Sequence, residues 1–181
     1  TPADYDGDGK TDVAVFRDGA WYLQRSQAGF ASVQFGAPGD IPQPADFDGD
    51  GRADLAVFRP ATNTWFILQS QTGTIWTQNF GTAGDRLTPA DFDGDGRADI
   101  AVFRPAEGTW FISLSTNGQM RSQQFGASGD VPTPADFDGD CSADPAVFRS
   151  AAGAWFYLQS SDGAFRSVQF GASGDKPVVG D

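Results

Sequence analysis

Apolar residues in this chain come in short runs separated by turn residues, and the whole pattern returns every 42 to 45 residues. In the second copy the runs cover residues 55–59, 65–69 and 77–80, and a short extended segment precedes them at residues 44–46. Valine, isoleucine, phenylalanine and tryptophan recur in the runs, and these residues favour extended backbone. No stretch carries a helical period. Each copy therefore predicts four short β-strands.

The copies differ in length at two places only. Arg17 and Trp21 are four residues apart where the other copies have six, and Trp21 and Phe35 are 14 apart where the others have 15. Both intervals contain glycine, asparagine or aspartate. Because turns on the surface tolerate insertions and deletions, we place turns between strands at both positions.

A supersecondary unit of this length predicts a repeat architecture. We expect an all-β fold, a β-propeller made of four-stranded antiparallel blades, with about 45 residues per repeat and four repeats. Residues 1–181 then form a single repeat domain, with blades at roughly 1–38, 39–83, 84–128 and 129–173, and with 174–181 as the start of a fifth repeat. A β-sandwich is the alternative, but it does not predict so strict a repeat.

Each copy also contains the acidic nonapeptide Asp-x-Asp-Gly-Asp-x-x-x-Asp. Carboxylates at positions 1, 3, 5 and 9 would repel one another unless a cation lay among them, and the carbonyl of position 7 could add another oxygen. A set of ligands made of oxygen alone selects calcium, and magnesium would bind more weakly. The predicted metal ligands are Asp4, Asp6, Asp8, Lys10 and Asp12; Asp46, Asp48, Asp50, Arg52 and Asp54; Asp91, Asp93, Asp95, Arg97 and Asp99; and Asp136, Asp138, Asp140, Ser142 and Asp144.

The loops are not EF-hands, because valine stands where an EF-hand needs its bidentate glutamate. Glycine at position 6 would allow a positive φ. In the fourth loop Cys141 replaces this glycine and Pro145 follows the last ligand. We therefore expect up to four Ca²⁺ ions, with the fourth site the weakest. The alternative is a set of acidic turns that hold no ion.

The net charge of −12 is concentrated in these loops, which contain 16 of the 24 acidic residues. Four divalent ions would reduce it to about −4, an ordinary value for a soluble domain. There is no basic patch for nucleic acid and no apolar run long enough for membrane insertion. The chain has no histidine and one cysteine. Catalytic triads that use histidine are therefore excluded, and so is an intrachain disulfide. We expect no enzymatic activity.

Two further residue types recur once per repeat. Tryptophans at one strand position predict packing between blades, whereas Trp76 lies outside that pattern and is the better candidate for contact with a ligand. Arginines at the end of each second strand predict pairing with the Gly-Asp carboxylates. The recurring residues are Trp21, Trp65, Trp110 and Trp155; Arg17, Arg59, Arg104 and Arg149; and Asp40, Asp85, Asp130 and Asp175.

Residues 35–40, 44–51 and 56–59 resemble the FG-GAP/VCBS-type repeats of integrin α-subunit-like β-propellers, particularly those of bacterial secreted and surface proteins. The resemblance implies a calcium loop between the first two strands of each blade, an extracellular location (secreted or on the cell surface), and a role in adhesion or ligand binding. It leaves the ligand open, as an unknown protein or a glycan, the latter for a lectin. Integrin-like rings have seven blades, so a four-bladed ring, a piece of a longer array, and self-association into a larger ring all stay open.

Overall fold

The computed structural model describes residues 2–179, so Thr1 and the predicted fifth loop at Asp181 lie outside the described residues. The described residues form β-strands and no helices. The strands are β1 (Val13–Arg17), β2 (Ala20–Arg25), β3 (Gly29–Gln34), β4 (Ile41–Pro42), β5 (Leu55–Arg59), β6 (Thr64–Leu68), β7 (Ile75–Asn79), β8 (Arg86–Leu87), β9 (Ile100–Arg104), β10 (Thr109–Ser113), β11 (Met120–Gln124), β12 (Val131–Pro132), β13 (Ala146–Arg149), β14 (Ala154–Leu158) and β15 (Phe165–Gln169).

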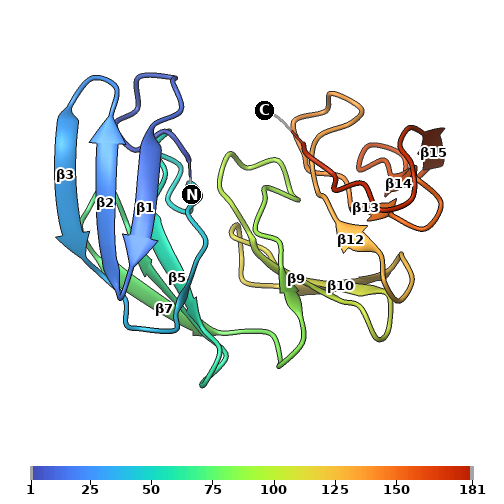
Figure 1. Cartoon of the computed structure of the whole chain (residues 1–181), viewed down its shortest axis with the longest axis horizontal. Coiled ribbons are helices and arrows are strands. Elements are labelled where there is room, and N and C mark those ends of the chain that lie inside the picture. Colours follow the sequence, from blue (N-terminus) through green and yellow to red (C-terminus); the bar gives the residue numbers. More distant parts are fainter. Residues whose placement is uncertain (1, 180–181) are drawn as a thin grey trace. The chain divides into compact units, whose positions relative to one another are not determined.

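The strands form antiparallel sheets in which neighbours in sequence are neighbours in space (Figure 1). Three sheets have four strands each, β4–β7, β8–β11 and β12–β15, and the sheet β1–β3 has three. We call them the first to fourth sheets in chain order, so that β1–β3 is the first. The first two sheets belong to one compact unit, Thr1–Ala83, and the last two belong to a second, Gly84–Asp181. The all-β, antiparallel prediction is confirmed.

The first strand of each four-stranded sheet has two residues and begins earlier than the sequence predicts. Its residues are Ile41 and Pro42, which pair with Phe58 and Val57, and not the predicted segment 44–46. The amide of Gln43 donates to the carbonyl of Ala56 at 2.8 Å, so the pairing continues past Pro42. The same register reaches Ala45, which forms an isolated bridge with Asp54. Pro42 and Pro44 lie at the alternate positions of this ladder, where no amide has to donate to β5.

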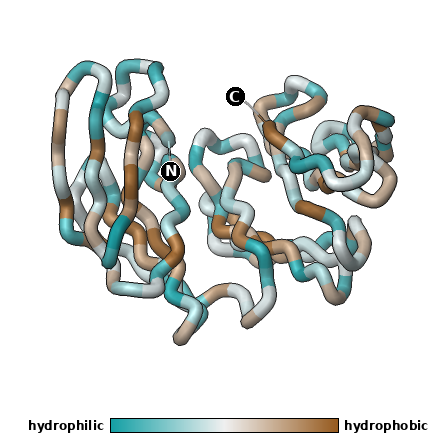
Figure 2. Tube along the Cα trace, viewed as in Figure 1, coloured by the Kyte–Doolittle hydropathy of each residue, from teal (hydrophilic) through white to brown (hydrophobic). Residues whose placement is uncertain are grey.

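In the first unit the core lies between the two sheets. Trp21 and Leu23 of β2 belong to one buried cluster with Leu55 and Val57 of β5. Trp21 is fully buried, and its Nε1 donates a hydrogen bond to the carbonyl of Phe35 at 2.9 Å. Hydrophobic stretches follow the strands, whereas the connecting loops are mainly hydrophilic (Figure 2). One face of the first sheet is thus covered by the second sheet.

The second unit repeats this arrangement with equivalent residues. Trp110 and Ile112 of β10 cluster with Ala143 and Val147, which belong to the fourth sheet and the loop before it. The indole of Trp110 donates to the carbonyl of Phe125 at 3.0 Å. The prediction that the recurring tryptophans pack between sheets is therefore confirmed for Trp21 and Trp110.

The predicted arginine–aspartate pairs form in three repeats. Each guanidinium donates from Nε and Nη2 to both oxygens of a carboxylate 19 residues earlier in the chain, at 2.8–3.1 Å. The pairs are Arg59 with Asp40, Arg104 with Asp85, and Arg149 with Asp130. Arg17 instead lies over the ring of Tyr22, 5.4 Å from its centroid.

No helix in the described part of the chain has the length and apolar character needed to cross a bilayer.

Candidate metal centres

Each acidic nonapeptide is closed into a loop by pairing between its last residue and the residue just before it. The residue before the loop forms an isolated bridge with the aspartate at position 9, as Ala45 does with Asp54. The amide of this aspartate donates to the carbonyl of that residue at 2.8 Å in all four loops. The eight residues between are therefore held in a tight turn at the start of β5 and its equivalents.

The aspartate at position 1 shapes this turn. Asp46 accepts hydrogen bonds from the amides of Gly49 at 2.6 Å and Gly51 at 2.8 Å, one on each oxygen. The other three loops have the same two bonds. Position 6 has a positive φ in every loop, 81° at Gly51 and 71° at Cys141. The predicted turn is confirmed, and Cys141 adopts it although it has a Cβ.

The aspartate at position 3 carries the clearest sign of a missing partner. In three loops one of its oxygens is buried and accepts no hydrogen bond from any described residue: Asp6 Oδ1, Asp93 Oδ1 and Asp138 Oδ1. In the second loop the equivalent oxygen of Asp48 accepts only a long bond of 3.3 Å from the amide of Asp50. A buried carboxylate oxygen without a partner is costly. These four atoms are where a cation would be expected to bind.

The aspartate at position 5 is held by a serine from the turn between the third and fourth strands of the same repeat. Ser70 Oγ donates to Asp50 Oδ2 at 2.9 Å. Serine stands at this position in all four repeats, a signal that our sequence reasoning missed; the pairs are Ser26–Asp8, Ser70–Asp50, Ser115–Asp95 and Ser160–Asp140. These serines tie each loop to the turn that faces it.

The predicted contribution of position 7 was its carbonyl, but its amide and side chain have roles of their own. The amide of Arg52 donates to Asp50 at 2.9 Å, and its Nε lies 3.3 Å from the same carboxylate. Lys10 and Arg97 likewise pair with the aspartate at position 5. Three of the four loops thus hold a cationic side chain against one carboxylate.

The aspartate at position 9 is buried and fully hydrogen-bonded by the backbone. Asp54 accepts from the amide of Phe47 at 2.9 Å and from that of Ser70 at 2.7 Å. Burial, opposed in part by these bonds, raises the pKa of Asp54 to about 6, and burial also raises the pKa of Asp99 and of Asp144. Position 9 therefore links the loop to its sheet, in addition to any contact with a metal.

The carboxylates meet closely enough to share one ion. In each loop three of them offer oxygens that all lie within 4.8 Å of one another: Asp4, Asp6 and Asp8; Asp46, Asp48 and Asp50; Asp91, Asp93 and Asp99; Asp136, Asp138 and Asp144. Every candidate donor is oxygen, which suits a hard divalent cation. The unpartnered buried oxygen at position 3 fits the same group. Such an ion would neutralise the clustered charge and cross-link the loop.

The comparisons with known proteins agree with this repeat. A family model described as the FG-GAP-like repeat matches residues 4–57, 46–102 and 91–147, and each match starts at an acidic loop. The chain therefore belongs to the FG-GAP-like repeat family, and its fold is that of an FG-GAP-repeat β-propeller protein. A search of curated protein sequences gave no match.

Three solved structures resemble the chain over 91–92% of its length. A lectin from Agrocybe aegerita that recognises non-reducing terminal N-acetylglucosamine has a TM-score of 0.64 at 20% identity. A streptogramin B lyase has 0.59 at 11%, and a protein from Bacteroides caccae has 0.58 at 15%. At these identities the likeness establishes the fold alone. The chain spans 50%, 53% and 59% of the three structures, respectively.

Proposed function

We propose that this protein is an extracellular propeller module that binds calcium in its acidic loops and uses the stabilised scaffold for adhesion or for binding a protein ligand. The observation that carries the proposal is the buried, unpartnered oxygen at position 3, seen at Asp6, Asp93 and Asp138. Membership of the FG-GAP-like family, whose repeats are typical of extracellular proteins, supports the location.

The calcium would be structural. Extracellular calcium sites often have dissociation constants of about 10⁻⁴ to 10⁻³ M. At roughly millimolar calcium each such site would contribute about 0.4–1.4 kcal/mol by mass action, and four would contribute about 2–6 kcal/mol. This is comparable with the net stability of a small domain.

Calorimetric titration of the calcium-free protein tests the proposal. We expect three ions per chain to bind more tightly than a fourth. Asp93→Asn should remove one of the tighter sites, because it removes the charge at the unpartnered oxygen. Asp162→Asn is the matched control: Asp162 lies in an exposed turn, where it accepts a bond from Ala164 at 2.7 Å, and its variant should bind as the wild type does. No uptake of calcium at millimolar concentration would refute the proposal.

We propose no catalytic role. The loops use most of the carboxylates, and the single glutamate, Glu107, lies 3.4 Å from Arg104 in an ion pair. No acid–base pair stands apart from the loops in our reading of the sequence. Turnover of acidic polysaccharides by the purified protein would contradict this part of the proposal.

A glycan-binding role is the second candidate, and a cavity in the second unit favours it. The cavity has a volume of about 290 Å³ and lies between the third and fourth sheets. Arg121, Gln123, Gln159 and Ser160 are among its lining residues, and Gln159 Oε1 is buried without a hydrogen-bond partner. A polar pocket with an unused acceptor suits a sugar hydroxyl. The propeller from Agrocybe aegerita with the highest TM-score of the three is itself a lectin.

A glycan array in saturating calcium separates the two candidates. If the cavity binds sugar, Arg121→Ala should abolish the signal, whereas Arg166→Ala, on the exposed outer strand β15, should not. An array without any signal would remove the lectin candidate and leave the calcium proposal untouched.

A further inference from the structure

Two acidic loops of the same unit are joined through their backbones. In the first unit the amide of Ala53, in the second loop, donates to the carbonyl of Asp4, in the first loop, at 2.7 Å. In the second unit the amide of Ala143 donates to the carbonyl of Asp91 at 2.6 Å. In both units position 8 of the later loop is bonded to position 1 of the earlier loop. Each candidate metal centre is therefore in direct contact with the other centre of its unit.

A side-chain contact joins the same pairs of loops. The residue at position 7 of the later loop lies over the glycine at position 4 of the earlier loop. A Cβ added to Gly7 would lie 2.8 Å from Cγ of Arg52, and one added to Gly94 would lie 2.7 Å from Oγ of Ser142. The amides of both glycines donate to the carboxylate at position 1 of their own loop at 2.7 Å. The later loop thus packs on the turn that the position 1 aspartate of the earlier loop shapes.

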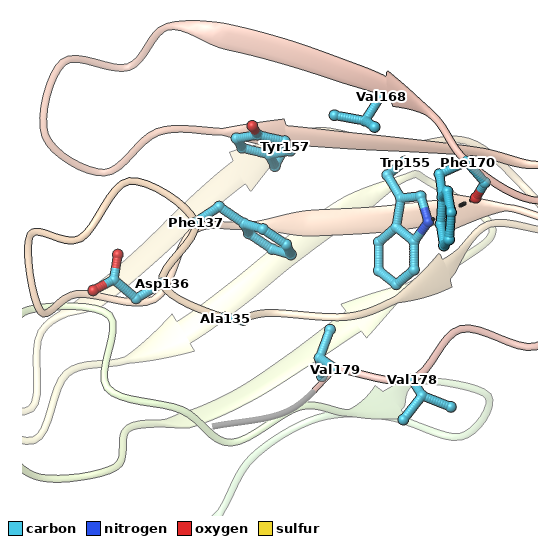
Figure 3. Close-up of a pocket in the computed structure, with 9 residues that line it drawn as sticks. All are labelled: Ala135, Asp136, Phe137, Trp155, Tyr157, Val168, Phe170, Val178 and Val179. Carbon is cyan, nitrogen blue, oxygen red and sulfur yellow. Dashed lines mark hydrogen bonds between the residues drawn. The ribbon is translucent and has the colours of Figure 1, made fainter.

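The aspartate at position 1 has different partners for its side chain and for its carbonyl. The carboxylate of Asp91 accepts the amides of Gly94 at 2.7 Å and of Gly96 at 2.8 Å, both in its own loop. Figure 3 shows the side chain of the equivalent Asp136, whose carboxylate points away from the ring of Phe137 and accepts the amides of its own loop. The carboxylate therefore serves its own loop, whereas the carbonyl of Asp91 serves the next one.

The amide that joins the loops belongs to the same peptide group as a predicted metal ligand. The peptide between Ser142 and Ala143 has the carbonyl of position 7 at one end and the donating N–H at the other. Because these two groups of a trans peptide lie in one plane and point in opposite directions, the bond to Asp91 turns the carbonyl away from the third loop. The carbonyl accepts a bond of 3.4 Å from Oγ of Ser160, which also donates to Asp140 at 2.9 Å. The earlier loop thus directs this carbonyl toward the carboxylates of the later loop.

An ion in either loop of a pair would favour an ion in the other. A cation at the position 7 carbonyl of the later loop polarises that peptide group, so its N–H becomes a stronger donor to the earlier loop. An ion in the earlier loop orders the position 1 aspartate, and this residue carries the acceptor that orients the position 7 carbonyl. The two effects are equal in free energy, because a coupling between two binding sites is reciprocal.

We propose that the calcium sites act in pairs, the first with the second and the third with the fourth, and that an ion in one loop of a pair raises the calcium affinity of the other. The inference rests on the proposed calcium function and goes beyond it, because that function requires only that each loop bind an ion. The carbonyls of Asp4 and Asp91 then position the following loop, in addition to any contact that their side chains make with a metal.

Calcium titration of the ¹⁵N-labelled chain, followed by NMR, tests the proposal loop by loop. Asp93→Asn removes the third site and should raise the calcium concentration at half-saturation of the fourth loop by about fivefold or more. Asp6→Asn is the matched control, because it makes the same change in the other unit. It should leave the fourth loop unchanged and raise the half-saturation concentration of the second loop. The reporters are the position 6 amides, which donate to the position 1 carboxylates at 2.8–2.9 Å: Gly9, Gly51, Gly96 and Cys141.

The wild-type chain provides a second test that needs no substitution. Coupled filling of the first two loops should make the titration curve at Gly51 steeper than a one-site isotherm. Calcium uptake with a one-site curve at Gly51, or with a half-saturation at Cys141 that Asp93→Asn does not move, would overturn the pairing and leave the calcium proposal intact. Absence of calcium uptake at all four reporters would overturn both.

Discussion

Arg59 donates two hydrogen bonds of 2.9 Å to Asp40, one to each carboxylate oxygen. The side chain of Asp40 is 2% exposed, and its Oδ2 also accepts a bond from the amide of Ala37 at 2.9 Å. The guanidinium lies 4.4 Å from the ring centroid of Phe66. The pair therefore fixes the link between the first and second sheets to the strand β5.

This pair makes stability depend on pH. The bond to Arg59 is the largest influence on the carboxyl, and it lowers the pKa of Asp40 although burial opposes it. A lowered pKa in the folded protein means that the stabilisation is complete above the unfolded pKa of about 3.9 and is lost as the pH falls through the folded value.

We expect Asp40→Asn to cost about 2 kcal/mol of unfolding free energy at neutral pH. The difference from the wild type should shrink as the pH falls through the lowered pKa of Asp40, because the wild-type carboxylate is then also protonated. Urea unfolding at a series of pH values measures it. Asp175→Asn is the control, since Asp175 occupies the same turn position but is exposed. A difference that does not change with pH would contradict the assignment.

The buried tryptophans should dominate the stability of the sheets. Trp65 is fully buried, and its Nε1 donates to the carbonyl of Phe80 at 3.2 Å. Trp65→Ala should cost about 3–5 kcal/mol, because it leaves a cavity and an unpaired carbonyl. Trp76 in the same sheet is 43% exposed, and Trp76→Ala should cost less than about 1 kcal/mol. Equal losses in urea unfolding would show that the packing role is misassigned.

Cys141 is strained by its backbone. Its φ is 71°, where the equivalent glycines have φ of 79–82°, and its amide still donates to Asp136 at 2.9 Å. Cys141→Gly should therefore stabilise the second unit by about 1 kcal/mol and strengthen calcium binding in the fourth loop. Cys141→Ser keeps the Cβ and removes the thiol, so it should change neither quantity. If serine has the effect of glycine, the thiol and not the backbone would be responsible.

Much of the fold could be predicted because the same pattern of strands and turns recurs in four copies along the chain. Strands β5, β9 and β1 follow from apolar runs, and the deletions next to Asp18 and Gly29 mark turns that the structure confirms at a positive φ. The first strand of the repeat was misplaced at 44–46, because residue propensity does not show that Ile41 and Pro42 pair with Phe58 and Val57.

The metal loops were predictable in composition but not in their division of roles. The spacing indicated four equal carboxylates, yet Asp54 accepts two backbone amides whereas Asp6 keeps one buried oxygen free of hydrogen bonds. This difference depends on the amide of Ser70, which comes from a turn 16 residues further along the chain. Sequence spacing within a loop carries no information about such a partner.

Calcium bound in the acidic loops should hold the sheets in their folded form. The most direct test compares urea unfolding of the wild-type chain in millimolar calcium with unfolding in excess EDTA, at the same ionic strength. We predict that calcium adds about 2–6 kcal/mol to the unfolding free energy, and that magnesium adds less. Identical unfolding curves in calcium and in EDTA would show that calcium does not stabilise the fold.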